Sequence, residues 1–355
     1  MIFKVLRTFA QKDKVCFPFC PAFIVLSRYI STVSPTYNLY SLITFLIPTY
    51  NYTCTRLVRD LQAQASELKS SAGSSFDYEI IVGDDGSTSY DTVLENREIN
   101  DLPGCRYVEH AGNVGRALIR NWLISMAHYR WVVLIDSDAE VCTADFVSRY
   151  WEHRCDADVV CGTLRNLAGS CKRGCELRYR YVRKAERWRN RRTYDNSPYL
   201  RLSTFNVMLN LDRLGDLRLD TRCSEYGYED SLLGLTLRER GLTIKHIDNP
   251  LIHTGIDTNT SFLSKTEAAM RTLHRLEGLM QEYAGTSRVY NALRLVHLDS
   301  AFRACFQLVR PLILLNLKGR HPSIKLFQLY KLGYYSVIDA CERRKDRMRY
   351  ESENI

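Results

Sequence analysis

The chain has 355 residues, enough for one large domain with appendages or for two small domains. Hydrophobic residues make up 45% of it and charged residues 25%, which is ordinary for a globular protein. The formal net charge of +9 is modest for this length, so we expect no nucleic-acid partner. No segment approaches the roughly 20 apolar residues that a membrane-spanning helix needs.

The first 40 residues differ in character from the rest of the chain. Several Lys and Arg residues precede a short apolar run, which Pro18 and Pro21 interrupt. We expect residues 1–40 to form an N-terminal extension that is poorly ordered or interfacial. The 12 cysteines are scattered and lack zinc-site spacing, which predicts free thiols in a reducing, cytoplasmic compartment.

From residue 41 onwards, short apolar runs alternate with segments of helical periodicity. Polar turns follow several of these runs, at Thr49, at Asp84 and Asp85, and at Asp136. The alternation predicts an α/β fold with a mostly parallel, Rossmann-like sheet flanked by helices, and ligands bind such sheets at the carboxyl edge of the strands. The expected strands are 42–48, 78–82, 106–109, 131–135, 157–162, 203–209 and 243–247, and the expected helices are 53–68, 91–98, 112–127, 231–240 and 265–283.

The apolar run from Trp131 to Ile135 ends in Asp136-Ser137-Asp138. Two carboxylates one residue apart at the end of a buried strand are costly unless a positive group faces them. A divalent cation shared with a phosphate group would satisfy this requirement, because such cations take hard oxygen ligands. The alternative is a strand-to-turn junction in which an Asp side chain caps the next helix.

Two later segments are basic. Residues 164–194 carry many more Lys and Arg than Glu residues. This predicts either a solvated helix or a mobile loop and helix that meet an anionic acceptor or phosphates at the mouth of the site. Residues 286–355 alternate apolar side chains with Lys and Arg, which predicts a basic amphipathic helical tail. Such a tail either lies on an anionic membrane surface or packs on the domain as a helical hairpin.

Five motifs follow one another between Ser41 and His253. In chain order they read FLIPTYN, IIVGDDGST, NVGRALIRN, LIDSD and GYEDSLLG. Each motif alone is weak, but their order and separation resemble a family 2 glycosyltransferase of the GT-A fold. We therefore expect three parts, which are the extension (1–40), a GT-A domain (41–285) and the C-terminal helical tail (286–355).

The resemblance implies a nucleotide-sugar site. One carboxylate of the Asp84-Asp85 pair accepts a hydrogen bond from the base, with Asp85 slightly favoured and a simple Asp-stabilised turn as the alternative. A uridine diphosphate sugar is the favoured donor. The nucleotide-contacting residues implied in this way are Pro48, Thr49, Tyr50, Asp84, Asp85, Asn113, Gly115, Arg120 and Asp136.

The resemblance also implies a metal ion and a catalytic base. Asp138 matches a direct ligand of Mn²⁺ or Mg²⁺, and His253 matches a third metal or phosphate contact, although a lone His is more often structural. Asp230, beside Glu229, matches the general base that takes the proton of an acceptor hydroxyl. The alternative is that both acids only cap a helix, where the macrodipole favours them.

The implied activity is transfer of one sugar, with inversion, to a glycan or glycolipid acceptor in polysaccharide or glycolipid synthesis. The setting implied by the family is the cytoplasm, with peripheral contact to the inner membrane face. A nucleotidyltransferase is an alternative enzyme class. The non-enzymatic alternative is an inactive protein that binds sugar nucleotides or serves as a membrane scaffold.

Overall fold

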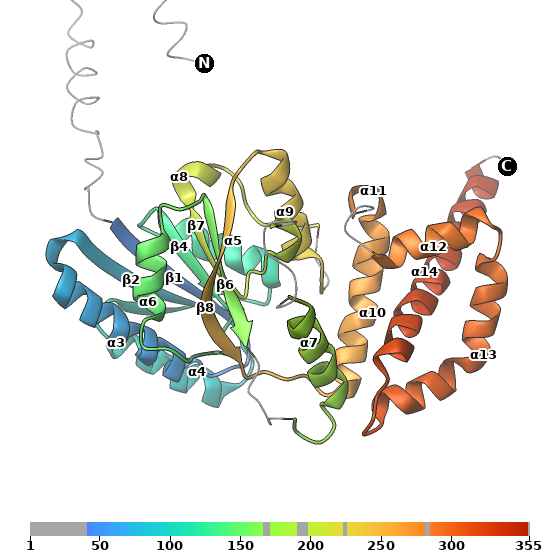
Figure 1. The fold of residues 1–355 in the computed structure, drawn as a ribbon, viewed down its shortest axis with the longest axis horizontal. Helices are drawn as coiled ribbons and strands as arrows, with labels where there is room; N and C mark the ends of the chain where they lie inside the picture. The colour runs from blue at the N-terminus through green and yellow to red at the C-terminus, as the bar shows by residue number, and fades with distance from the viewer. Residues whose placement is uncertain (1–40, 166–170, 190–197, 223–225, 281–284, 354–355) are drawn as a thin grey trace, which may run out of the picture. The chain divides into compact units, whose positions relative to one another are not determined.

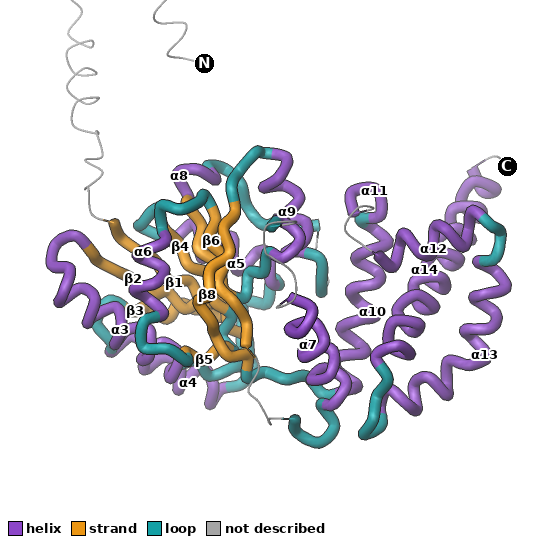
Figure 2. The backbone as a smooth tube through the Cα atoms, viewed as in Figure 1, coloured by secondary structure: helices purple, strands orange, loops and turns teal. Residues whose placement is uncertain are grey.

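A computed structural model describes residues 41–165, 171–189, 198–222, 226–280 and 285–353 (Figure 1). The predictions for residues 1–40, and parts of the basic segment 164–194, lie outside the described residues. Strands and helices alternate up to His253, and helices alone follow (Figure 2). The strands are β1 (Ser41–Thr49), β2 (Phe76–Asp84), β3 (Cys105–Glu109), β4 (Trp131–Ile135), β5 (Ala139–Val141), β6 (Val159–Arg165), β7 (Asn206–Asn210) and β8 (Ile244–His253).

The helices of the described residues surround this sheet and continue beyond it. They are α3 (Thr55–Ala72), α4 (Tyr90–Arg97), α5 (Arg116–Met126), α6 (Phe146–His153), α7 (Glu176–Arg189), α8 (Leu211–Leu214), α9 (Glu229–Glu239), α10 (Asn259–Arg275), α11 (Glu277–Met280), α12 (Gly285–Leu295), α13 (Asp299–Lys318) and α14 (Ile324–Glu353). Short 3₁₀ turns η1 (Gly73–Ser75), η2 (Glu98–Asp101) and η4 (Tyr199–Arg201) connect them.

The eight strands form one sheet in the order β3-β2-β1-β4-β7-β6-β8-β5. Strands β3, β2, β1 and β4 run parallel to one another, as predicted, and β6 is parallel to β8. The chain-order pattern did not reveal that β7 lies between β4 and β6 and runs antiparallel to both. The sheet is therefore mixed, although the strands that carry the predicted turns share one carboxyl edge.

Strand β5 was not predicted, and it fixes the geometry of that edge. It pairs with β8 at the far end of the sheet, with Ala139 opposite His253. Only residues 136–138 separate β5 from β4, and four residue steps span at most about 14 Å. The sheet must therefore curl so that the end of β8 returns to the carboxyl end of β4. Because β8 extends to His253, this histidine ends the strand and does not follow it.

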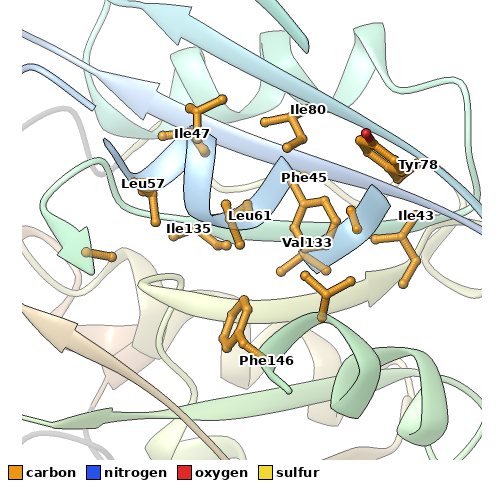
Figure 3. Close-up of a cluster of buried hydrophobic side chains, with 14 of the residues drawn as sticks. Ile43, Phe45, Ile47, Leu57, Leu61, Tyr78, Ile80, Val133, Ile135 and Phe146 are labelled. Carbon is orange, nitrogen blue, oxygen red and sulfur yellow. The ribbon is translucent and has the colours of Figure 1, made fainter. Parts of the chain in front are cut away.

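Apolar side chains cover both faces of the sheet and pack against helices on each side. Successive residues of β1 point to opposite faces and so contribute to both layers. Ile43, Phe45 and Ile47 pack with Leu57 and Leu61 of α3 (Figure 3), in the same cluster as Phe146 of α6. Leu46 faces the other layer, which α5 and α9 cover. Each fully buried side chain of this kind contributes roughly 1.5–3 kcal/mol. The core thus anchors the strand ends on which the candidate site is built.

The C-terminal helices share cores with the rest of the chain. Leu232 of α9 packs in one cluster with Met270 of α10, Tyr290 of α12 and Tyr335 of α14. A second cluster joins α7, α10, α13 and α14. The packing therefore continues across residue 285, and α14 contacts α10, α12, α13 and α7.

One face of α13 nevertheless exposes large apolar side chains to solvent. Leu308, Leu312 and Leu315 are 81%, 69% and 74% exposed. Leu295 at the end of α12 and Val296 in the loop before α13 are exposed as well. None of the helices in the described part of the chain combines the length and the apolar character that a membrane crossing requires.

Candidate functional site

A cavity of about 410 Å³ opens at the carboxyl ends of β1, β2 and β4. We call it the strand-end cavity. Most of the residues predicted to contact a nucleotide line it, and this proximity follows from the sheet order, in which β2, β1 and β4 are neighbours. Its lining consists of Pro48, Thr49, Tyr50, Tyr52, Asp85, Asn113, Gly115, Arg116, Ile119, Arg120, Asp136, Ser137, Asp138 and Lys265.

The two carboxylates that end β2 have different surroundings. Asp84 accepts hydrogen bonds from the Tyr107 hydroxyl and from the Ser87 amide (2.6 Å), and it lines neither of the two cavities described here. Asp85 lines the strand-end cavity and accepts hydrogen bonds from the Val114 and Gly115 amides at 2.7 and 3.0 Å. Of the predicted pair, Asp85 is the carboxylate placed to meet a ligand.

The loop before α5 is shaped by glycine. Gly115 has φ +89° at the N-cap of α5, a conformation that residues with a side chain rarely adopt. At Gly86 (φ +71°), an added Cβ would lie 2.5 Å from the backbone of Gly112. This close approach brings the Asp85 carboxylate onto the amides at the start of α5, where the helix dipole favours negative charge.

Arg120 is the buried cation of the strand-end cavity. It is only 3% exposed, pairs with Asp136, and donates a hydrogen bond to the Arg116 carbonyl at 3.1 Å. Its Nε is buried without a hydrogen-bond partner. The first carboxylate of the Asp-Ser-Asp turn is thus neutralised by a side chain of the chain itself, so Asp136 needs no cation.

The second carboxylate of that turn is paired differently. The register of β5 and β8 places His253 Nε2 3.0 Å from Asp138 Oδ2. Burial would raise the pKa of Asp138, but the hydrogen bond and charge of His253, with Arg116 and Lys265, hold this pKa below its ordinary value. Asp138 therefore stays ionised at neutral pH. At Gly255 an added Cβ would lie 2.3 Å from Asp138 Oδ2, so no larger residue fits there without displacing the carboxylate.

Asp138 and His253 fit a divalent cation only when a ligand completes its coordination. Among the described residues, no group of three or more His, Cys, Asp or Glu side chains is arranged to hold a metal ion. One carboxylate oxygen and one imidazole nitrogen leave several positions open. Mg²⁺ is commonly bound through one or two carboxylates together with phosphate groups of a substrate.

A second cavity of about 530 Å³ is lined from α7, α9, α10 and α14, together with η4. We call it the helical cavity. Glu229 and Asp230 enter it from the first turn of α9. The preceding Tyr228 adopts a left-handed conformation (φ 67°), which costs about 1 kcal/mol or more for a residue with a side chain. Strain of this kind is common at functional sites, and here it sets the direction in which α9 begins.

Asp230 is held in one orientation by Thr204. The Thr204 amide and hydroxyl both donate to Asp230 Oδ1, at 3.1 and 2.7 Å. Burial and the adjacent charge of Glu229 raise the pKa of Asp230, against the hydrogen bonds from Thr204 and the charge of Arg120. A fixed carboxylate with a raised pKa is suited to accept a proton.

Arg116 lies between the two cavities and lines both. Its guanidinium is 3.5 Å from Glu229 and lies 4.7 Å above the centre of the Tyr226 ring. Lys265 of the strand-end cavity lies 5.6 Å from the same ring. The two cavities are therefore neighbours that share Arg116 in their linings.

Sequence reasoning did not assign a role to Arg116, Lys265 or Tyr226. The four-residue spacing of Arg116 and Arg120 on one helix face was a usable signal for Arg116. No comparable signal marked Lys265 and Tyr226, because their positions depend on how α10 packs beside α9.

Comparison with known proteins gives one family match in sequence. Residues 44–207 match the model of the family described as glycosyl transferase family 2. No curated protein matches the chain.

Solved structures resemble the chain at low sequence identity. The mannosyltransferase PcManGT from Pyrobaculum calidifontis, in complex with GDP-Man and Mn²⁺, is 15% identical with a TM-score of 0.50, covering 91% of this chain and 94% of that one. TarS 1–349 from S. aureus is 15% identical with a TM-score of 0.45, covering 85% and 91%. Glucosyl-3-phosphoglycerate synthase from Mycobacterium tuberculosis, in complex with Mn²⁺, UDP-Glc and phosphoglyceric acid, is 20% identical with a TM-score of 0.43, covering 66% and 79%.

Proposed function

This chain belongs to glycosyl transferase family 2 through residues 44–207 and has the GT-A fold, and we propose that it transfers a sugar from a nucleoside diphosphate to an acceptor hydroxyl. The observation that carries the proposal is that two cavities with different lining residues lie side by side and share Arg116. The strand-end cavity offers Asp85 and Asp138, and the helical cavity offers Asp230. Arg116 lines both. This arrangement suits a donor in the first cavity and an acceptor in the second.

The residues of the strand-end cavity would bind the donor nucleotide. Asp85 would accept a hydrogen bond from the base, for which uracil is our first choice, and Arg120 would keep Asp136 in place. Asp138 and His253 would hold Mn²⁺ or Mg²⁺. That ion supplies neutralisation of the charge that develops on the departing diphosphate. The complex of PcManGT with GDP-Man and Mn²⁺ supports this kind of donor.

Asp230 would act in the helical cavity as the general base. It would take the proton of the acceptor hydroxyl while that oxygen attacks the anomeric carbon, and the bond to the diphosphate breaks. The attacking oxygen and the leaving group lie on opposite faces of that carbon, so the configuration inverts. Thr204 keeps the accepting carboxylate in one orientation, and its raised pKa makes it a stronger base. The acceptor would be a glycan or glycolipid.

A panel of nucleoside diphosphates and their sugar conjugates tests this proposal. We expect one nucleoside diphosphate to raise the melting temperature, by an amount that grows with its concentration as binding linkage requires. Its sugar conjugate should be hydrolysed slowly, with water in place of the acceptor. Release of inorganic pyrophosphate from a nucleoside triphosphate would instead indicate a nucleotidyltransferase. Nucleotide binding without any turnover, with acceptors supplied, would favour an inactive binding protein.

We further propose that the protein contacts a membrane surface through the exposed face of α13. Leu308, Leu312 and Leu315 support this contact, since no charged side chain interrupts them on that face. Arg344 and Arg347 lie in the basic end of α14, whose Arg343 is 3.5 Å from Asp299 at the start of α13. Exposed apolar and basic groups together favour an anionic bilayer.

Flotation with vesicles of phosphatidylcholine, with and without phosphatidylglycerol, measures this contact. We expect the full chain to float with anionic vesicles and the double variant Leu308→Ser/Leu312→Ser to stay at the bottom. The control Leu94→Ser/Leu118→Ser removes two exposed leucines from other helices and should float normally. Equal flotation of both double variants would exclude α13 as the contact. Truncation before α12 is unsuitable, because it removes Tyr290 and Tyr335 from a core.

A further inference from the structure

The helical cavity contains two cations that pair with no carboxylate in the described part of the chain. Arg178 enters it from α7 and Lys331 from α14. Neither side chain forms an ion pair with any Asp or Glu of the described residues, whereas Arg116 in the same lining pairs with Glu229. The Nε of Arg178 is in addition buried without a hydrogen-bond partner. Both side chains are partly exposed, so water solvates their charges, and an anionic ligand would replace that water with charge-assisted hydrogen bonds.

An aromatic cluster holds Arg178 at the cavity wall. The Arg178 guanidinium lies 4.8 Å above the centre of the Phe262 ring, and Phe262 stacks on Phe327 at 5.2 Å. Tyr181 packs against both rings, at 5.5 and 5.4 Å. One turn of helix separates Phe327 from Lys331, so α7, α10 and α14 meet at this cluster. The rings of Phe262 and Phe327 are buried, so this part of the wall is fixed by packing within the fold.

We propose that the acceptor carries a phosphate group, and that Arg178 and Lys331 bind this phosphate while Asp230 takes the proton of the acceptor hydroxyl. The inference rests on the proposed function, and it names the class of acceptor. A guanidinium and an ammonium together match the charge and the several oxygens of a phosphate. The aromatic wall provides apolar contact for the carbon skeleton of a sugar or polyol. A cavity of about 530 Å³ is within the usual range of small-molecule sites.

Two sources share this chemistry. A phosphate monoester would come from a soluble sugar phosphate or polyol phosphate. A phosphodiester would come from a phosphate-linked glycan or from a lipid headgroup. Glycerol 3-phosphate represents the first and glycerophosphoglycerol the second, and glycerol without phosphate serves as the blank for both.

Isothermal titration of the full chain tests the proposal, with the nucleoside diphosphate from the panel present at saturation. The filled strand-end cavity then cannot take the probe. We expect one of the two phosphate probes to bind, and glycerol not to bind. Arg178→Gln and Lys331→Gln should each weaken probe binding at least about tenfold. The matched controls Lys184→Gln on α7 and Lys325→Gln on α14 remove exposed cations outside the cavity lining and should bind the probe normally.

The affinity for the nucleoside diphosphate is measured on the same samples. This affinity shows whether each variant is folded, and it distinguishes a failure of the phosphate-acceptor proposal from a failure of the proposed sugar-transfer function. Normal nucleotide binding with unchanged probe affinity in both cavity variants would overturn the phosphate acceptor and leave the proposed function standing. The phosphate-acceptor proposal would also be overturned if the probe bound only in the absence of the nucleoside diphosphate, because the probe would then occupy the strand-end cavity. Absence of nucleotide binding in the wild type would instead contradict the proposed function itself.

Discussion

Asp230→Asn is expected to lower the rate of sugar transfer by about 10²–10⁴-fold, the usual contribution of a positioned general base. An asparagine keeps the shape of the side chain, and its oxygen still accepts the hydrogen bonds that Thr204 donates. It has no basic carboxylate to receive the proton of the acceptor hydroxyl. The rate is measured as nucleoside diphosphate release with acceptor present. The control Asp216→Asn changes an exposed acid and should keep the full rate.

The pH dependence of the wild type follows from the raised pKa of Asp230. The base is active only when ionised, so the rate should fall as pH drops through a value above the ordinary carboxylate pKa. A raised pKa in the folded state also means that the ionised carboxylate is disfavoured by folding. Above that pKa, Asp230→Asn should therefore leave the melting temperature unchanged or raise it. A large loss of stability at neutral pH would contradict this assignment.

Asp138→Ala is expected to weaken metal-dependent nucleotide binding by at least about 10–100-fold, the range found when groups that support a metal site are removed. Asp138 has a lowered pKa, so the wild type should keep its metal-binding carboxylate ionised well below neutral pH. A chelator should weaken nucleotide binding by the wild type and have little effect on the variant. The measurement is nucleotide affinity with Mn²⁺, with Mg²⁺ and with chelator.

His253→Ala distinguishes two roles for the histidine next to Asp138. If His253 is a ligand, its removal should weaken nucleotide binding nearly as much as Asp138→Ala does. If it only orients Asp138 through their 3.0 Å contact, the loss should be smaller. Nucleotide affinity that is indifferent to chelator in the wild type would contradict the metal site altogether.

The sequence predicted the parts of the site that local pattern determines. The apolar runs that became β1, β2 and β4 are short and end in polar turns, so Asp85 and Asp138 could be placed at one edge before any contact was known. The helix after Glu229 and Asp230 was predicted as 231–240, and the family resemblance placed the two acids at its start, where α9 begins. In each case the signal lies within a few residues of the side chain concerned.

What the sequence could not predict depends on long-range pairing. Strand β5 has three residues, too few for periodicity, yet its register with β8 is what joins Asp138 to His253. The apolar run of β7 does not indicate that this strand pairs with β4 in antiparallel direction. Asp84 and Asp85 are neighbours with the same chemistry, and their surroundings differ through Tyr107 on β3 and through the amides at the start of α5, which come from distant parts of the chain.

The C-terminal segment shows the same limit. Its pattern predicted either a tail on a membrane surface or a helical hairpin packed on the domain, because amphipathic periodicity alone does not say which surface a helix covers. Tyr330 and Tyr335 of α14 are fully buried, and Lys331 between them lines the helical cavity. This helix therefore contributes to the candidate acceptor site, a role that no motif in the sequence indicated.

The central claim is that the strand-end cavity binds the donor and that Asp230 in the helical cavity acts as the base. One pair of measurements on wild type and Asp230→Asn tests it most directly. Both the dissociation constant for the nucleoside diphosphate and the rate of sugar transfer are determined on the same samples. We predict equal dissociation constants and a transfer rate at least about 10²-fold lower in the variant. Equal transfer rates would show that Asp230 is not the base, and loss of nucleotide binding together with transfer would show that the two cavities do not act separately.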